Sequence, residues 1–377
     1  MLIQLDESLL GSLGELSQPE WDGVINLAVA AREGHHYLIA SRALAAALSH
    51  KTEMGPRERA LYKALSDRHS TIAGMASQVR MRARVTRDLV AERVTVSGIT
   101  EIRIPLSFFS STVATQPAIL LCENLDDCNL IHEMARLFAR AENMGAIRTN
   151  LDMRSGGGST TADVADGILA NGRRLLLTVV DSDRETPDGA LGDTAKSARS
   201  VFRERNLATG EILILDGRDL ENLLPDEFYR SEFENDLDHS VSVAFITALD
   251  GAGCSGARLH IDVKKGLTLD KLLMRKNPPQ DFQAVWGVVA VRVSQGGLPC
   301  SAACVACASA ASCLNPLACA CILTQPNGGA LLSRGVQAFR QHGREMWRTL
   351  PGCLKSAVND VARSAFDWGC ATAFQPS

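Results

Sequence analysis

The sequence contains no apolar run long enough to cross a membrane. Its longest apolar stretches fall well short of the roughly 18 to 20 residues that a spanning helix needs. Its first residues, Met-Leu-Ile-Gln-Leu-Asp-Glu, lack the basic start and the apolar core of a signal peptide. Internal repeats and low-complexity tails are missing as well. We therefore expect a cytoplasmic protein that makes no use of a membrane.

The chain also lacks a strong overall charge, since its formal net charge of −4 gives no global attraction to nucleic acid. A local basic face is still compatible with this value, because binding depends on how charge is distributed. The clearest candidate is the run that contains Arg80, Arg82, Arg84 and Arg87. The alternative for this run is a solvated helix or strand face without a ligand.

With 377 residues, 46% of them hydrophobic, the chain has the composition of a globular protein with two or three domains. Helix-start residues near Ser17 and Gly55 precede apolar residues at helical spacing. Residues 88–106 switch to the period of strands around a Ser97-Gly98 turn. We predict four segments: a helical domain at 1–87, connecting strands at 88–114, a catalytic α/β domain at 115–270 and a C-terminal region at 271–377.

Acidic residues follow three apolar runs of the central domain, which read as buried strands of a parallel sheet. The runs cover residues 118–122, 175–180 and 212–215, and the acids that follow them are Glu123, Asp127, Asp181, Asp183 and Glu221. Helical segments separate the runs, which predicts right-handed βαβ units. Ligands of such sheets bind beyond the carboxyl ends of the strands, so these acids predict a Mg²⁺ site. For any one acid the alternative is a helix cap.

The order of these acids resembles the TOPRIM fold, the metal-binding domain of topoisomerases, primases and several nucleases. Glu123 matches the glutamate after the first strand, and Asp181 with Asp183 matches the later Asp-x-Asp. The spacing of Glu123 and Asp127, the glycines at 156–158 and the run at 218–225 are closer to the OLD-family nucleases. The resemblance covers residues 115–270. It departs from the usual pattern at Asn124, where many TOPRIM domains have glycine.

The resemblance implies a metal-dependent nuclease that hydrolyses DNA or RNA, with Mg²⁺ or Mn²⁺ as cofactor. Lys264, after a strand predicted at 259–264, is the best candidate for the lysine that offsets charge on the phosphate. OLD proteins usually carry an ATPase, but a Gly-x-x-x-x-Gly-Lys-Ser/Thr loop is missing here. A separate ATPase or sensor protein is therefore an expected partner, and defence against phage or plasmids the typical role. The N-terminal part is expected to sense a partner or to form a homodimer.

A cysteine cluster distinguishes the C-terminal region, between a strand predicted at 287–293 and helices predicted at 336–350 and 354–368. Its members are Cys300, Cys304, Cys307, Cys313, Cys319 and Cys321. Thiolates at such short intervals suit tetrahedral Zn²⁺, for which four of the six suffice. An iron–sulfur cluster and a set of buried packing thiols are the alternatives.

Three other classes of protein share parts of this sequence pattern. A topoisomerase needs a tyrosine nucleophile, and Tyr37, Tyr62 and Tyr229 do not lie in a recognisable DNA-breaking domain. A primase usually places its zinc element before the TOPRIM domain, whereas this cluster follows it. A non-catalytic nucleic-acid-binding module of a recombination or repair complex combines the same two parts. Its acidic set is typically incomplete, and the complete set here favours an enzyme.

Overall fold

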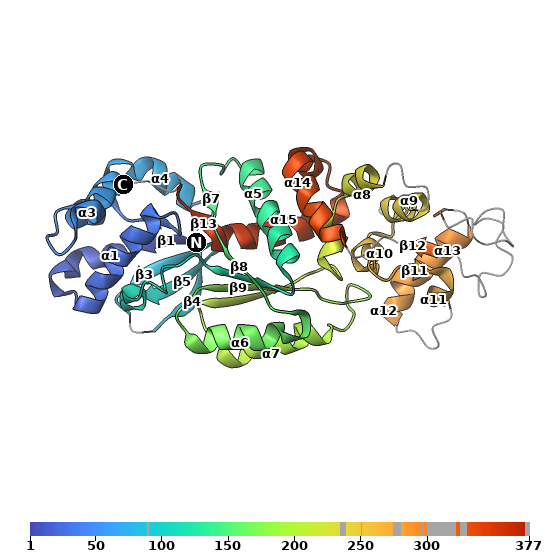
Figure 1. Cartoon of the computed structure of the whole chain (residues 1–377), viewed down its shortest axis with the longest axis horizontal. Coiled ribbons are helices and arrows are strands. Elements are labelled where there is room, and N and C mark those ends of the chain that lie inside the picture. The colour runs from blue at the N-terminus through green and yellow to red at the C-terminus, as the bar shows by residue number, and fades with distance from the viewer. Residues whose placement is uncertain are drawn as a thin grey trace. The chain divides into compact units, whose positions relative to one another are not determined.

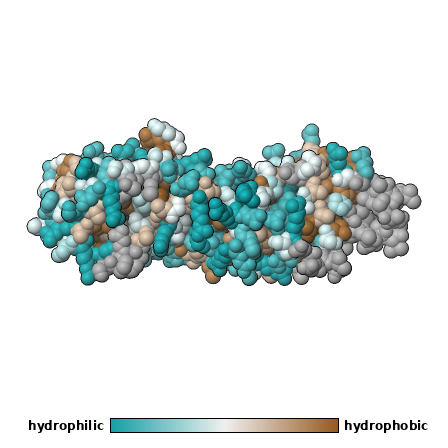
Figure 2. Space-filling model, turned by 90° about the horizontal axis from the view of Figure 1, so that it is seen from above, coloured by the Kyte–Doolittle hydropathy of each residue, from teal (hydrophilic) through white to brown (hydrophobic). Residues whose placement is uncertain are grey.

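The computed structural model describes residues 1–88, 90–233, 239–249, 251–273, 280–295, 297–299, 322–324 and 330–373. These form an α/β protein with two compact units (Figure 1). The first unit consists of Met1–Val179, Ser197–Leu213 and Ala362–Ser377, and the second of Val180–Lys196 and Ile214–Val361. Within the described residues, no helix is both long and apolar enough to span a membrane. Figure 2 shows a mostly hydrophilic face on which apolar residues form small, scattered patches.

A five-stranded sheet in the order β2-β1-β3-β5-β4 lies in the first unit. Its strands are β1 (Leu2–Leu5), β2 (Tyr37–Ile39), β3 (Met81–Thr86), β4 (Glu92–Val96) and β5 (Ile99–Pro105). The pairs of β1 with β2, β1 with β3 and β3 with β5 are parallel, and β4 is antiparallel to β5. The hairpin predicted around Ser97-Gly98 is confirmed, and both turn residues have positive φ, at 51° and 79°. Leu89 lies outside the described residues.

The region 1–87, predicted as a helical domain, also supplies three strands of the sheet, which the sequence did not indicate. β1 and β2 are short and almost wholly buried, and the period of so short an apolar run cannot separate strand from helix. The helices here are η1 (Glu7–Glu15), α1 (Gln18–Arg32), α2 (Arg42–Ser49), α3 (Pro56–Asp67), α4 (His69–Ala76) and η2 (Leu106–Ser110). As predicted, α1 begins at Ser17, whose side chain forms a capping box with Glu20.

A second sheet has the strand order β10-β9-β6-β8. Its strands are β6 (Ile119–Cys122), β8 (Asp152–Ser155), β9 (Leu176–Val180) and β10 (Gly210–Ile214). The three predicted strands are confirmed, and β6 is parallel to β8 and β9. In Figure 1, α5 (Leu125–Ala141) lies on one side of this sheet, and α6 (Thr161–Asn171) and α7 (Asp193–Arg205) lie on the other. Sequence analysis missed β8, because Asp-Met-Arg-Ser carries no apolar run.

Small elements complete the first unit: β7 (Arg148–Thr149), η3 (Gly158–Thr160) and β13 (Cys370–Ala371). The second unit contains η4 (Leu220–Leu223), α8 (Asp226–Glu232), α9 (Ser240–Ala248), α10 (Ser255–His260), β11 (Leu267–Thr268), α11 (Leu269–Leu273), α12 (Gln280–Phe282), a π-helical turn η5 (Gln283–Gly287), α13 (Val288–Ser294), β12 (Ile322–Thr324) and α14 (Leu331–Arg348). α15 (Gly352–Gly369) follows. The two predicted terminal helices are thus confirmed as α14 and α15, whereas the cysteine cluster at 300–321 lies outside the described residues.

Two strands predicted in the second unit are helical instead. The strand expected at 259–264 is the end of α10 followed by a loop, and the one expected at 287–293 is α13. Tertiary contacts override the strand propensity of the valines in α13. Trp286, Val289 and Val293 are buried while Val288 and Val291 are exposed, so burial follows the helical period.

Candidate functional site

Three of the predicted catalytic residues meet in the second unit. Asp181 directly follows β9, Glu221 lies in η4, and Lys264 lies in the loop after α10. Lys264 Nζ is 3.2 Å from Glu221 Oε2 and 3.6 Å from Asp181 Oδ2. The other carboxylate oxygen of Asp181 accepts a hydrogen bond from Leu220 N at 3.0 Å, which ties Asp181 to η4. We call Asp181, Glu221 and Lys264 the lysine cluster.

Asn222 fixes the two segments that carry Glu221 and Lys264. It is fully buried, and its Oδ1 accepts a hydrogen bond from Asp219 N at 3.0 Å, as part of a capping box that begins η4. Its Nδ2 donates to Arg258 O at 3.3 Å and to Ile261 O at 2.9 Å. One amide side chain therefore holds η4 against the chain that leads to Lys264.

Arg258 secures the same junction, and sequence analysis did not find it. The guanidinium is buried, and it donates to Asn222 O at 3.0 Å and to Leu224 O at 2.8 Å. It also lies 3.4 Å from Asp226 Oδ1 and over the Tyr229 ring at 5.5 Å. Neither the spacing nor the neighbours of Arg258 give a sequence signal, since its acceptors are backbone carbonyls that lie more than thirty residues away along the chain.

Electrostatics keep Lys264 charged. Burial opposes the positive charge of Lys264, but nearby carboxylates, led by Asp181 and Glu221, outweigh it and raise the pKa of the ammonium. Burial raises the pKa of Asp219 to about 6, with Lys264 acting in the opposite direction. Glu221 is 2% exposed, and its Oε2 accepts no hydrogen bond of good geometry from the described residues. Lys264 is thus the cation nearest to this buried carboxylate oxygen, at 3.2 Å.

Asp183, the second acid of the predicted Asp-x-Asp, lines a pocket to which Asp181 does not contribute. It is exposed and has a left-handed backbone, with φ at 54°, and its N–H donates to Arg218 O at 2.9 Å. It lines a pocket of about 290 Å³ together with Arg218, Glu185 and Asp281. The two aspartates therefore serve neighbouring but different surfaces of the second unit.

Glu123 and Asp127 belong to the first unit, where both have structural contacts. The carbonyl of Glu123 accepts hydrogen bonds from Gly157 N at 2.9 Å and Gly158 N at 3.2 Å. Asp127 caps α5, because its Oδ2 accepts from Asn124 N at 3.0 Å. Gly156 N also donates to Cys122 O at 2.7 Å, so three amides of the glycine loop hold the end of β6. A metal-binding role for Glu123 and Asp127 stays a prediction.

The donor set limits the kind of metal site that the chain can form. Among the residues that the structure describes, no group of three or more His, Cys, Asp or Glu side chains is arranged to hold an ion. Asp181 and Glu221 nevertheless converge on one point, at Lys264. Mg²⁺ is commonly bound through one or two carboxylates, with water and substrate phosphates as its other ligands. The pair therefore fits an ion that binds together with a phosphate and does not fit a closed protein cage.

A second pocket in the same unit is lined by both aromatic and basic side chains. It has a volume of about 430 Å³ and contains Phe282, Trp286, Lys265, Lys271 and Arg218 among its lining residues. Trp286 Nε1 donates to Glu185 O at 2.6 Å, which fixes the indole ring.

Comparisons of the chain with models of protein families, with curated proteins and with solved structures found no match.

Proposed function

We propose that the protein is a metal-dependent nuclease of the TOPRIM type, which hydrolyses phosphodiester bonds in DNA or RNA. The observation that carries this proposal is the lysine cluster. The sequence predicts Asp181, Glu221 and Lys264 as catalytic residues, and the two carboxylates lie 3.6 and 3.2 Å from Lys264 Nζ although up to 83 positions separate the three residues. In an isolated surface ion pair, a lysine contacts one exposed carboxylate. Here Lys264 contacts two carboxylates that are partly or fully buried.

Each member of the cluster has a role that follows from its chemistry. Asp181 and Glu221 would hold the metal ion. When bound, Mg²⁺ or Mn²⁺ supplies an activated water and neutralises charge on the phosphate. Lys264, whose raised pKa keeps it protonated at neutral pH, stabilises the negative charge that develops on the phosphate oxygens.

The aromatic and basic pocket supports a nucleotide substrate. Phe282 and Trp286 offer apolar and aromatic surface for a base, and Lys265, Lys271 and Arg218 offer positive charge for the flanking phosphates.

The test is cleavage of plasmid DNA and of total RNA with Mg²⁺ or Mn²⁺. We expect Lys264→Ala and Asp181→Asn to lower the rate by about a hundredfold or more. The matched control is Lys63→Ala, which removes an ion pair of similar length, 3.4 Å, from a highly exposed site. Wild-type rates in both cluster variants would contradict the assignment of these residues.

A non-catalytic nucleic-acid-binding module is the second candidate. It is favoured by the compensation of charge inside the lysine cluster, where one ammonium already pairs with two carboxylates. Binding of nucleic acid without cleavage, in the presence of either metal, would support it. A separate ATPase or sensor partner and a role in defence rest on the family resemblance alone.

A further inference from the structure

The basic run around Arg82 lies at a distinctive place in the first unit. β1 pairs with β2 along one edge and with β3 along the other, so the chain changes direction across the sheet between these strands. In parallel α/β sheets, ligands bind near such a switch point. Arg82 and Arg84 both belong to β3 and, two residues apart, point to the same face of the sheet.

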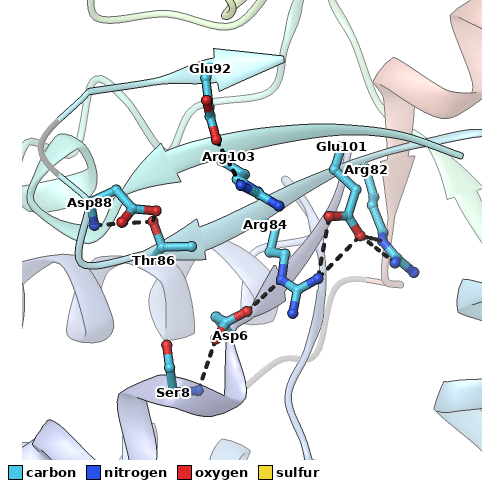
Figure 3. A network of polar contacts seen from close by, with 9 residues as sticks. All are labelled: Asp6, Ser8, Arg82, Arg84, Thr86, Asp88, Glu92, Glu101 and Arg103. Atoms are coloured by element: carbon cyan, nitrogen blue, oxygen red, sulfur yellow. Dashed lines mark hydrogen bonds and ion pairs between the residues drawn. The ribbon is translucent and has the colours of Figure 1, made fainter. Parts of the chain in front are cut away.

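Carboxylates hold both arginines in place (Figure 3). Glu101 of β5 is fully buried, and it accepts hydrogen bonds from Arg82 Nε at 3.1 Å and from Arg84 Nη1 at 3.3 Å. Arg82 Nη2 also donates to Glu101, and Arg84 Nε donates to Asp6, which follows β1. In Figure 3, Arg84 lies between Asp6 and Glu101. The carboxylates thus set the orientation of two guanidinium planes before any ligand arrives.

Each arginine has one terminal nitrogen that is available to donate a hydrogen bond to a ligand. Within the described part of the chain, Arg82 Nη1 and Arg84 Nη2 make no hydrogen bond. The side chains are 17% and 33% exposed, and both line a pocket of about 360 Å³. This volume is in the lower part of the range for small-molecule sites.

The rest of the pocket mixes polar and apolar side chains. Ser41, Ser77, His69 and Gln4 contribute polar groups, Glu7 contributes a carboxylate, and Ile39 and Ile99 are among the apolar lining residues. Gln4 Oε1 is buried and has no hydrogen-bond partner among the described residues. A buried amide oxygen without a partner is costly, so a ligand with a donor group would relieve this cost.

We propose that this pocket binds a small molecule with a phosphate or carboxylate group, held by Arg82 and Arg84. Anchored guanidinium groups recognise such planar or tetrahedral anions in pairs of hydrogen bonds. The volume admits a ligand about the size of a mononucleotide, with its polar body near Gln4 and Ser41. This site does not depend on the lysine cluster. It would give the N-terminal region a ligand-binding role.

The experiment measures ligand binding to the full chain by calorimetry and by the shift of the thermal unfolding midpoint. The probes are inorganic phosphate, acetate, AMP and adenosine, without divalent metal. We expect at least one of the two simple anions to bind and to raise the midpoint, AMP to bind where phosphate does, and adenosine to have no effect. Binding of phosphate but not of acetate would identify a phosphate ligand. Binding of acetate but not of phosphate would identify a carboxylate ligand.

Two variants make the site testable without loss of the fold. Arg82→Lys keeps the charge beside Glu101 but loses the planar fork, and Gln4→Leu removes an amide oxygen that has no hydrogen-bond partner among the described residues. We expect each to weaken binding of the anion by about fivefold or more. The unfolding midpoint of Gln4→Leu without ligand should stay near that of the wild type, because the oxygen that it removes makes no hydrogen bond to the described residues. The matched control is Arg205→Lys, at an exposed arginine that forms two hydrogen bonds with Asp166, at 2.7 and 2.9 Å. The absence of binding by every anion, or equal binding by wild type and variants, would overturn the proposal.

Discussion

Replacement of Asn222 by alanine should loosen the second unit at one identifiable point. The variant removes three hydrogen bonds, which join the amide to Asp219 N, Arg258 O and Ile261 O at 3.0, 3.3 and 2.9 Å. Asn222 is fully buried, so water cannot readily replace these bonds. Each buried backbone group left without a partner costs about 1 to 3 kcal/mol. We therefore expect a loss of at least about 3 kcal/mol in the free energy of local opening.

Hydrogen exchange followed by mass spectrometry reads this loss segment by segment. A loss of about 3 kcal/mol corresponds to exchange that is faster by about a hundredfold. The effect should be confined to peptides that cover residues 218–224 and 258–264, while the first unit keeps its wild-type protection. Asn171→Ala is the matched control, because Asn171 is exposed at the end of α6 and should change stability by less than about 0.5 kcal/mol. Unchanged exchange in both peptides would refute the bridging role of Asn222.

Two further predictions concern the first unit. Tyr62→Phe removes a buried hydrogen bond of 2.9 Å from the hydroxyl to Val24 O. It should lower the free energy of unfolding in urea by about 1 to 2 kcal/mol. An unchanged midpoint of urea unfolding would argue against this bond. Burial raises the pKa of Asp367 to about 7 from its ordinary value of 3.8, with Arg363 acting in the opposite direction. The folded state therefore holds a proton that the unfolded state releases, so the wild type should lose stability as pH rises from about 4 to about 7. Asp367→Asn should flatten this slope in thermal unfolding measured across that range, and an identical slope would contradict the pKa assignment.

Sequence reasoning succeeded where a local pattern fixes the structure. Buried apolar runs such as 118–122 and 175–180 became strands, and the Ser97-Gly98 turn became a hairpin with positive φ at both positions. It failed where short apolar segments are compatible with either period. β1 and α13 were assigned to the wrong class because the period of so short an apolar run does not separate strand from helix.

The candidate sites show the same division. The sequence by itself determined which residue types follow the strands, and so it predicted Asp181, Glu221 and Lys264 as members of one site, although the strand expected at Lys264 is the end of α10 followed by a loop. Only the tertiary structure decided that Asp183 turns to another pocket, that Asp127 caps a helix, and that buried carboxylates orient Arg82 and Arg84. Local patterns arise from neighbours in the chain, whereas burial, pKa and the direction of a side chain depend on residues that meet only after folding.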